Sequence, residues 1–246
     1  MLEINNITFG YSSNANVLQD FSLKYSEPGI YGMLGKNGTG KSTLLYLIMG
    51  LLHAKQGNIT FMGHDTKDRN PEALKEMFIV PEEYNLPNIS LSDYVKVIKP
   101  FYPNFDASLM VKLLEGFDMA RVNNSSLDAD GMPTFNLGAL SMGQKKKVYM
   151  CIALATRTKL LVMDEPTNGL DILSKSQFRK VVAQGMREDQ IIIISTHQVR
   201  DVETLLDHVT IIDKNTVLLN EAMNLDEPVN LEELFIKTLT QKEIGE

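Results

Sequence analysis

The amino-acid sequence predicts an α/β fold with a mostly parallel central sheet, an N-terminal antiparallel β subdomain and an inserted α-helical subdomain. Two continuous apolar runs of strand length, residues 160–163 and 191–194, are typical of central strands in a parallel sheet that is covered on both faces. Alternating apolar and polar positions over residues 2–26 predict antiparallel strands at the start of the chain.

The chain length and the position of the helical spacing predict the domain organisation. At 246 residues the chain is long enough for one large domain with a subdomain. Helical spacing with irregular connections prevails from about residue 82 to residue 157, between strand-like segments on either side. We therefore expect a single domain, residues 1–246, with 1–81 and 158–246 in the core and β subdomain and about 82–157 in the helical subdomain.

The individual elements follow from apolar runs, helical spacing and turn residues. Gly10 and residues 12–16 break the alternating segment into two strands. The later predicted strands are residues 29–34, 57–63, 77–80, 160–163, 191–194, 209–213 and 216–219. The predicted helices are residues 43–49, 91–98, 107–117, 174–186 and 230–240. Asp106 suits an N-cap, and Lys214-Asn215 would form the turn of a terminal hairpin.

The composition limits the functions that the chain can serve. A formal net charge of −7 argues against nucleic-acid binding through electrostatics. The one cysteine, Cys151, allows no internal disulfide and lies in an apolar run that indicates a buried helix face. The sequence has no basic segment followed by an apolar signal core, and no apolar run approaches the ~18 residues of a membrane helix. We therefore expect a soluble cytoplasmic protein, whose membrane partner, if it has one, is another chain.

A glycine-rich segment, Gly35–Ser42, lies between a predicted strand and a predicted helix. Its glycines allow backbone N–H groups to surround an anion, and the helix that follows adds unpaired N–H groups and the positive end of its dipole. Lys41 can reach the β- and γ-phosphates of a nucleotide, and the Ser42 hydroxyl can bind Mg²⁺. An ordinary turn is the alternative, but the Lys-Ser pair and the flanking elements favour a nucleoside triphosphate site. The residues assigned to nucleotide binding here are Gly35, Lys36, Asn37, Gly38, Thr39, Gly40, Lys41, Ser42 and Thr43.

Two acidic residues, Asp164 and Glu165, follow the apolar strand 160–163. A carboxylate at the end of a buried strand beside a phosphate loop is suited to hold Mg²⁺, directly or through water, and we assign Asp164 to this role. Successive strand side chains alternate in direction, so Glu165 would point elsewhere and could polarise the water that attacks the γ-phosphate. Two exposed acids at a strand end are the alternative, but the apolar run favours the catalytic site.

Two further segments are ambiguous when they are read from the residues alone. His197 follows strand 191–194 and would emerge at the same edge of the sheet, where it could donate a hydrogen bond to the γ-phosphate. A lone histidine after a strand is, however, usually structural. Leu140–Gln144 precedes a predicted helix, and a turn of small residues there is either an anion site or an N-cap. The lysines 145–147 that follow are expected on a solvated helix face.

Taken together, the order of these motifs resembles that of the ATP-binding cassette ATPases, the motor subunits of ABC transporters. Leu140–Gln144 is similar to the signature of that family, residues 168–171 to its D-loop, and Thr196-His197 to its switch histidine. Tyr11 matches the aromatic residue that stacks on adenine. The resemblance spans nearly the whole chain and implies a P-loop NTPase core that binds ATP and Mg²⁺, with Glu165, His197 and Lys41 as the catalytic residues.

The resemblance also implies a partner subunit. In this family two cassettes pair head to tail, and each ATP lies between the phosphate loop of one cassette and the signature of the other. Ser141, Gly143, Gln144 and Asp171 would therefore contact the nucleotide across the interface. Both half-sites look intact, which favours a homodimer with two working sites, and a heterodimer is the alternative. No nucleic-acid partner is expected.

The chain departs from the family pattern at two positions. The signature has Met142 where glycine is usual, although Ser141 and Gly143 are in place. Glu82 stands where the family usually has a glutamine that contacts Mg²⁺ and the attacking water. A glutamate can still accept a hydrogen bond from metal-bound water, but it adds negative charge near the triphosphate. We expect Glu82 to be a further Mg²⁺ contact that tunes how hydrolysis is coupled to the partner.

These observations predict an ATPase subunit that dimerises on MgATP and drives a separate membrane permease from the cytoplasmic face of the membrane. The segment from residue 101 to the signature resembles the cassettes of exporters whose permease is a separate polypeptide. A soluble cassette ATPase that acts in assembly or in another process without transport is the alternative. Co-purification with a membrane protein would discriminate between the two functions.

Overall fold

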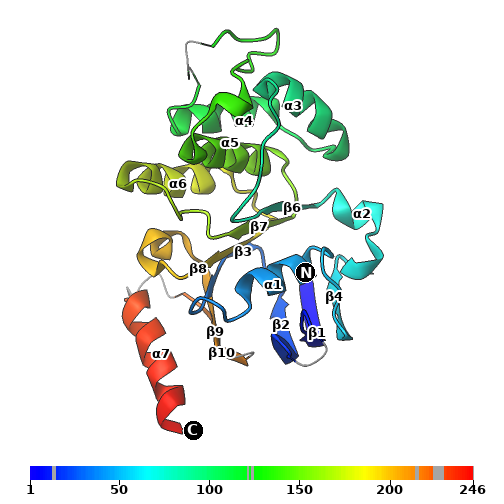
Figure 1. Ribbon diagram of the computed structural model, residues 1–246, viewed down its shortest axis with the longest axis vertical. Coiled ribbons are helices and arrows are strands. Elements are labelled where there is room, and N and C mark those ends of the chain that lie inside the picture. Colours follow the sequence, from blue (N-terminus) through cyan, green and yellow to red (C-terminus); the bar gives the residue numbers. More distant parts are fainter. Residues whose placement is uncertain (13–14, 121, 123–124, 214–215, 224–229, 246) are drawn as a thin grey trace.

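The computed structural model describes residues 1–12, 15–120, 122, 125–213, 216–223 and 230–245, and it has an α/β architecture with two sheets (Figure 1). The larger sheet has six strands in the order β10-β9-β3-β8-β7-β6. Its strands are β3 (Gly29–Leu34), β6 (Met77–Val80), β7 (Leu160–Asp164), β8 (Ile191–Thr196), β9 (His208–Asp213) and β10 (Thr216–Ala222). Neighbouring strands are parallel except for β9 and β10, which confirms the prediction of a mostly parallel sheet.

The central strands β7 and β8 are buried along their whole length. Successive residues of β8 pack into different apolar clusters, with Ile192 in the cluster that the helical region shares and Ile193 in the cluster that the N-terminal sheet shares. Both faces of the sheet are therefore covered. This is the reason that these strands are continuous apolar runs and not alternating ones.

The smaller sheet is antiparallel and has the strand order β2-β1-β4-β5. Its strands are β1 (Leu2–Phe9), β2 (Leu18–Tyr25), β4 (Gln56–Phe61) and β5 (His64–Asp65). Helix α1 (Lys41–Ile48) packs on this sheet, because Leu44 of the helix belongs to the same buried cluster as Phe21 of β2 and Phe61 of β4. The antiparallel N-terminal sheet is as predicted.

The remaining helices are α2 (Pro71–Leu74), α3 (Leu91–Ile98), α4 (Ala107–Gly116), α5 (Met142–Ala155), α6 (Ile172–Gly185) and α7 (Leu231–Gly245). Helices α3, α4 and α5 lie together at the end of the molecule opposite to the antiparallel sheet (Figure 1). The carboxylate of Asp106 accepts a hydrogen bond from the backbone N–H of Leu109 at 2.8 Å and caps α4, as predicted. Cys151 of α5 is fully buried, and this burial raises the pKa of its thiol.

The register of the parallel strands brings three loops to one edge of the large sheet. Leu34 of β3 pairs with Thr196 of β8, and Asp164 of β7 pairs with Ser195 of β8. The phosphate loop, Glu165 and His197 each follow one of these strand ends directly. The fold therefore brings Glu165 and His197 to the same edge as the phosphate loop, which precedes both by more than a hundred positions.

Some element boundaries differ from the predicted ones. Helix α1 begins at Lys41, two residues earlier than predicted, so that the lysine itself opens the helix. Helix α6 begins at Ile172, and α7 extends to Gly245. The predicted turn at Lys214-Asn215 lies outside the described residues. The limits of the helical subdomain near residues 82 and 157 stay predictions.

Strand β4 ends at Phe61, before the predicted end. Met62 and Gly63 adopt positive φ angles of 52° and 81°, and they turn the chain into the short strand β5. The left-handed conformation at a methionine is uncommon, and apolar alternation alone does not reveal it. Within the described residues, no helix is long and apolar enough to cross a membrane.

Candidate active site

The phosphate loop forms a tight turn between β3 and α1 that leaves its backbone N–H groups accessible. Gly38 and Gly40 adopt positive φ angles of 81° and 93°, which side chains disfavour. At Gly35 a Cβ atom would lie 2.7 Å from the carbonyl oxygen of Ile212, so that position has no room for one. Gly40 is the N-cap of α1 and provides no side chain to cap it. The first N–H groups of α1 thus remain available to an anion.

Lys41 lies across the inside of this loop. Its Nζ atom donates hydrogen bonds to the carbonyl oxygens of Gly35 at 2.7 Å and Lys36 at 3.1 Å, and it lies 3.9 Å from Oε1 of Glu165. The side chain is 6% exposed, and this burial lowers the pKa of the ammonium group, whereas Glu165 and Asp164 act in the opposite direction. The lysine is therefore a poorly hydrated cation that faces the carboxylate of Glu165.

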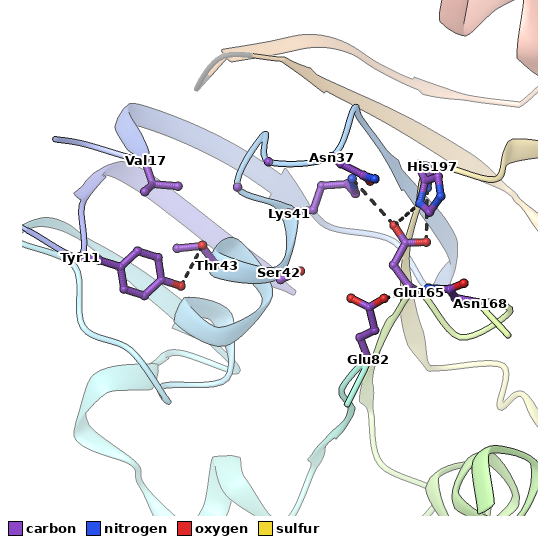
Figure 2. A pocket seen from close by; sticks show the side chains of 12 residues that line it. Tyr11, Val17, Asn37, Lys41, Ser42, Thr43, Glu82, Glu165, Asn168 and His197 are labelled. Atoms are coloured by element: carbon purple, nitrogen blue, oxygen red, sulfur yellow. Dashed lines mark hydrogen bonds and ion pairs between the residues drawn. The ribbon is translucent and has the colours of Figure 1, made fainter. Parts of the chain in front are cut away.

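A pocket of about 570 Å³ opens beside the loop (Figure 2). The predicted site residues that line it are Tyr11, Asn37, Gly38, Gly40, Lys41, Ser42, Thr43, Glu82, Glu165 and His197. Val17 and Asn168 also line the pocket, and neither is among the predicted site residues. Val17 lies next to the phosphate loop: a Cβ atom placed on Gly40 would be 3.1 Å from the Val17 side chain. Val17 directly precedes β2, and its backbone N–H donates to the carbonyl of Phe9 at 2.7 Å.

Glu165 is the most constrained residue of the pocket. Its side chain is 8% exposed, and its Oε1 atom lies 2.9 Å from Nδ1 of His197 (Figure 2). The backbone N–H of His197 also donates to Oε2 at 3.4 Å. The backbone φ of Glu165 is +44°, in the left-handed region that side chains disfavour. The carboxylate is thus held between Lys41 and His197.

Asp164 is buried beside the site and does not line the pocket. It is 1% exposed, and its carboxylate accepts a hydrogen bond from the hydroxyl of Ser195, while the Ser42 hydroxyl is close enough to lower its pKa. Burial raises the pKa of Asp164, and the two serine hydroxyls oppose that shift. The Ser42 hydroxyl and the Asp164 carboxylate are therefore neighbours, and both are oxygen donors of the kind that Mg²⁺ prefers.

Glu82 and Asn168 meet at the side of the pocket opposite Tyr11. The side-chain amide of Asn168 donates a hydrogen bond to Oε1 of Glu82 at 2.9 Å. Glu82 follows strand β6, and Asn168 follows β7. Because neighbouring parallel strands end at one edge, these two loops lie close together.

Tyr11 stands at the open end of the pocket. Its hydroxyl lies within hydrogen-bond distance of Thr43 Oγ1 at 3.1 Å, and its ring contacts Phe9 edge to face at a centroid distance of 5.1 Å. The side chain is 67% exposed. One face of the ring is thus available for stacking by a planar group.

The signature residues do not line this pocket. Ser141 and Gln144 cap α5 reciprocally: the backbone N–H of Gln144 donates to Ser141 Oγ at 3.3 Å, and the backbone N–H of Ser141 donates to Gln144 Oε1 at 3.0 Å. A Cβ atom on Gly143 would meet no atom within 4 Å. Met142 is 70% exposed. Within this chain the segment is an N-cap whose outer surface is open.

Asp171 also lies outside the pocket, at the start of α6. Its carboxylate accepts hydrogen bonds from the backbone N–H and the hydroxyl of Ser174, both at 2.8 Å. These hydrogen bonds lower the pKa of Asp171. Ile172 and Leu173, the next two residues, are 90% and 67% exposed.

The expectation that residues 145–147 form a solvated helix face is wrong. Lys146 is 9% exposed, and its Nζ atom donates to the carbonyl oxygens of Asn168 at 2.8 Å and Glu165 at 3.2 Å. Lys147 donates to Oε1 of Gln177 at 3.1 Å and lies over the ring of Phe117. Sequence spacing does not show that the loop after β7 returns against α5, and this contact is what buries Lys146.

Comparisons with known proteins identify the family to which this arrangement is similar. A family model described as "ABC transporter" matches residues 18–168. The chain is 29% identical to the lantibiotic transport ATP-binding protein SrtF of Streptococcus pyogenes over 85% of each chain. It is also 29% identical to the zinc uptake system ATP-binding protein ZurA of Listeria monocytogenes, over 85% of this chain and 81% of that protein. A solved ATP-binding subunit of an ABC transporter superposes with a TM-score of 0.80 at 23% identity, covering 97% of this chain and 99% of the other, and shares the fold.

Proposed function

The chain belongs to the ABC transporter family, as an ATP-binding subunit that hydrolyses ATP, and from this premise we propose that it dimerises on MgATP to power a separate membrane permease, in the direction of export. The observation that carries the proposal is the convergence of Lys41, Glu165 and His197 in one pocket beside the phosphate loop. The chain would then act at the cytoplasmic face of the membrane through its permease.

The geometry supports a hydrolytic role for each of these three residues. The backbone N–H groups of the phosphate loop and Lys41 bind and orient the β- and γ-phosphates. Glu165 accepts the proton of the attacking water as the new bond to the γ-phosphorus forms and the bond to the ADP oxygen breaks. His197, through the hydrogen bond from Nδ1, keeps the Glu165 carboxylate in place. Most of the catalysis is then orientation and charge stabilisation.

The residues around Ser42 and Asp164 fit a magnesium ion that is bound together with the nucleotide. Within the described part of the chain, no group of three or more His, Cys, Asp or Glu side chains is arranged to hold a metal. Mg²⁺ is commonly held by one or two carboxylates together with substrate phosphates, and it keeps several waters. We infer that Ser42 and Asp164 would hold it, with Glu82 as a further contact through water. When bound, the ion would neutralise charge that develops on the phosphates.

The exposed ends of α5 and α6 support dimerisation with a second copy. Ser141, Gly143 and Gln144 lie outside the pocket of their own chain, and Met142 beside them is exposed. Ile172 and Leu173 next to Asp171 are exposed apolar side chains at the start of α6. A second cassette would cover these side chains and would receive the signature residues at its own nucleotide. We propose a homodimer, because one chain carries both halves of the site.

An apolar groove supports a membrane partner. The groove has a volume of about 590 Å³ and lies between α1–α2 and the start of the helical region. Phe101 and Leu51, which line it, are 69% and 53% exposed. Ile79 of β6 also lines the groove, and Glu82 of the nucleotide pocket is three residues further along the chain. A permease segment that binds here would thus be joined to the nucleotide pocket by one short stretch of backbone.

The mechanism is tested with Glu165→Gln. We expect ATP hydrolysis to fall about 100-fold or more, because the glutamine amide cannot take the proton of the attacking water. ATP binding and the ATP-induced dimer should persist, and both can be measured by fluorescent nucleotide titration and light scattering. Glu188→Gln, an exposed acid in another part of the chain, is the matched control and should hydrolyse ATP normally. Hydrolysis by Glu165→Gln at the rate of the unaltered chain would show that Glu165 is not the base.

The transport role is tested by purification of the chain from membranes in detergent. Recovery of a stoichiometric integral membrane protein would support the permease partner, and recovery of the chain from the soluble fraction with no such protein would favour the soluble-ATPase alternative. The direction is tested in vesicles made from that complex. ATP added on the side of the chain should move cargo away from that side, and movement toward it would refute export.

A further inference from the structure

Lys146 makes a contact that none of the proposed catalytic roles uses. It is the fifth residue of α5, two residues after Gln144, and it is 9% exposed. Its Nζ atom reaches the carbonyl oxygens of Glu165 and Asn168 at 3.2 Å and 2.8 Å. Both oxygens belong to the backbone that leads from β7 to α6. Burying a lysine without hydrogen-bond partners costs free energy of folding, and these two hydrogen bonds offset that cost.

The backbone that Lys146 contacts is the part of the site that most needs support. Glu165 has a φ of +44°, a conformation that a glutamate keeps when its surroundings hold it there. The backbone N–H of Glu165 donates to the carbonyl of Ser195 at 3.0 Å. The carbonyl of Glu165 accepts from the backbone N–H of Asn168 at 3.1 Å and from Lys146. Lys146 is therefore the side chain that fixes this peptide from the α5 side.

Asn168 lies between Lys146 and the carboxylate of Glu82. The side chain of Asn168 donates to Oε1 of Glu82, and the main chain of Asn168 accepts from Lys146. Asn168 thus connects the carboxylate of Glu82 to the ammonium group of Lys146. Burial lowers the pKa of Lys146, and Glu82 is the foremost of the three acids that oppose this shift, ahead of Glu165 and Asp164. The carboxylate that stands where the family usually has a neutral glutamine lies near a buried cation.

We propose that Lys146 is a positioning residue for Glu165, and that its positive charge offsets the negative charge that Glu82 brings to the pocket. The proposal rests on the proposed role of Glu165 in hydrolysis. Through it, the helix that carries the signature residues holds the backbone of Glu165, the proposed base, in the same chain. A movement of α5 against the core would move the Glu165 peptide with it.

The test compares Lys146→Met with Lys145→Met, which removes the same charge from the preceding helix position. Hydrogen exchange is measured without nucleotide, and steady-state kinetics are measured with MgATP. In Lys146→Met we expect the backbone amides of Glu165 and of residues 167–170 to exchange roughly ten times faster. We also expect kcat to fall about 10- to 100-fold, while KM for ATP changes less than about threefold, because the base is misplaced and the phosphate loop is intact. Lys145→Met should change neither quantity.

A second variant tests the role of charge. In the Lys146→Met background, Glu82→Gln should recover part of the lost kcat, because it removes the carboxylate that has lost its cation. If Lys146→Met does not fold, Lys146→Gln removes the charge, keeps a polar tip and is measured in the same way.

Loop exchange and kcat in Lys146→Met that match those of Lys145→Met would overturn the proposal, as would a further loss of kcat in the double variant. An unaltered chain that does not hydrolyse ATP would refute the proposed function. The exchange rates, which need no nucleotide, would still show whether Lys146 holds the Glu165 segment.

Discussion

Two glycine-containing turns in this molecule begin helices, and the two helix starts differ in how their N–H groups are satisfied. Before α1, the N-cap is Gly40, which has no side chain to accept a hydrogen bond. Before α5, Ser141 and Gln144 form a reciprocal capping box. The first turn is partly enclosed and has a buried lysine inside it, whereas the second is exposed around Met142.

This difference shows that the two turns are suited to different ligands. The orphan N–H groups at the start of α1 require an acceptor, and a phosphate provides it within one chain. The start of α5 has its own acceptors, so it needs no ligand for its stability. A nucleotide that binds there would do so through outward-facing hydroxyl, amide and N–H groups presented to another chain. In the proposed dimer, the phosphate loop would be the half of the site that one chain completes, and the signature turn would be the half that requires a partner.

The largest expected effect comes from removing the cation from the first turn, which tests whether this turn binds the phosphates. Lys41→Met should weaken ATP binding by a single chain about 100-fold, because two charge-assisted contacts to phosphate oxygens are lost at about 1.5 kcal/mol each. Isothermal titration with ATP measures the effect. Lys67→Met, a surface lysine that pairs with Asp65, is the control and should bind ATP as the unaltered chain does. ATP affinity that survives Lys41→Met would mean that the phosphates bind elsewhere.

The motif residues of the first turn could be predicted from the sequence because the chemistry depends on local order. Glycines, Lys41 and Ser42 occur within eight positions between a strand and a helix, and the backbone of that segment largely determines where they point. The fold class was predictable for a similar reason, since the fully apolar runs of β7 and β8 reflect burial on two faces.

The features that were not predictable depend on contacts between distant segments. Lys146 is buried because the loop after β7 packs against α5, twenty residues away in sequence, and nothing in the local pattern distinguishes it from Lys145. The positive φ of Glu165 occurs in the same loop, and apolar alternation along the strand does not reveal it. Asn168 was recognised as part of a family motif, but its hydrogen bond to Glu82 spans eighty-six positions.

A substitution in the second turn should have a smaller effect, and it should change hydrolysis without changing ATP binding. Ser141→Ala should leave ATP binding by the single chain unchanged and should lower ATP hydrolysis about tenfold, because the serine would act on the nucleotide of the second subunit. The loss of the cap should also lower the free energy of unfolding by about 1 kcal/mol. Hydrolysis, dimer formation and thermal unfolding are measured in parallel.

Asp106→Ala is the control that separates these two effects. Asp106 caps α4 through Leu109, so its removal should cost a similar free energy of unfolding, about 1 kcal/mol, without a change in hydrolysis. Equal losses of hydrolysis in the two variants would mean that Ser141 acts through helix stability. The signature turn would then not act on the nucleotide of a second subunit.

The smallest expected effect is on the free energy of unfolding, and it concerns two acids, Asp164 and Asp171. Burial raises the pKa of Asp164, so its ionised form destabilises the folded state at neutral pH. Asp164→Asn should therefore slightly increase the free energy of unfolding at pH 7, even though it removes a carboxylate that we propose for the metal site. Because the folded state takes up the proton more readily than the unfolded state, the difference should shrink as the pH falls from 7 toward the pKa of the unfolded chain. Thermal unfolding in the absence of nucleotide, from pH 7 to pH 4.5, measures this trend.

Asp171, the N-cap of α6, should respond with the opposite sign. Hydrogen bonds from Ser174 lower its pKa, so its ionised form stabilises the folded state above the pKa of the unfolded chain, and that stabilisation is lost as the pH falls. Asp171→Asn should thus be slightly less stable than the unaltered chain at pH 7, with a difference that also narrows in acid. Opposite signs for the two variants would mean that ionised Asp164 lowers the stability of the folded chain until a metal and phosphates bind. Ionised Asp171, in contrast, would stabilise the helix that it caps without any ligand. If both variants were stabilised, Asp171 would resemble Asp164, and the capping hydrogen bonds could not account for the difference between the two halves.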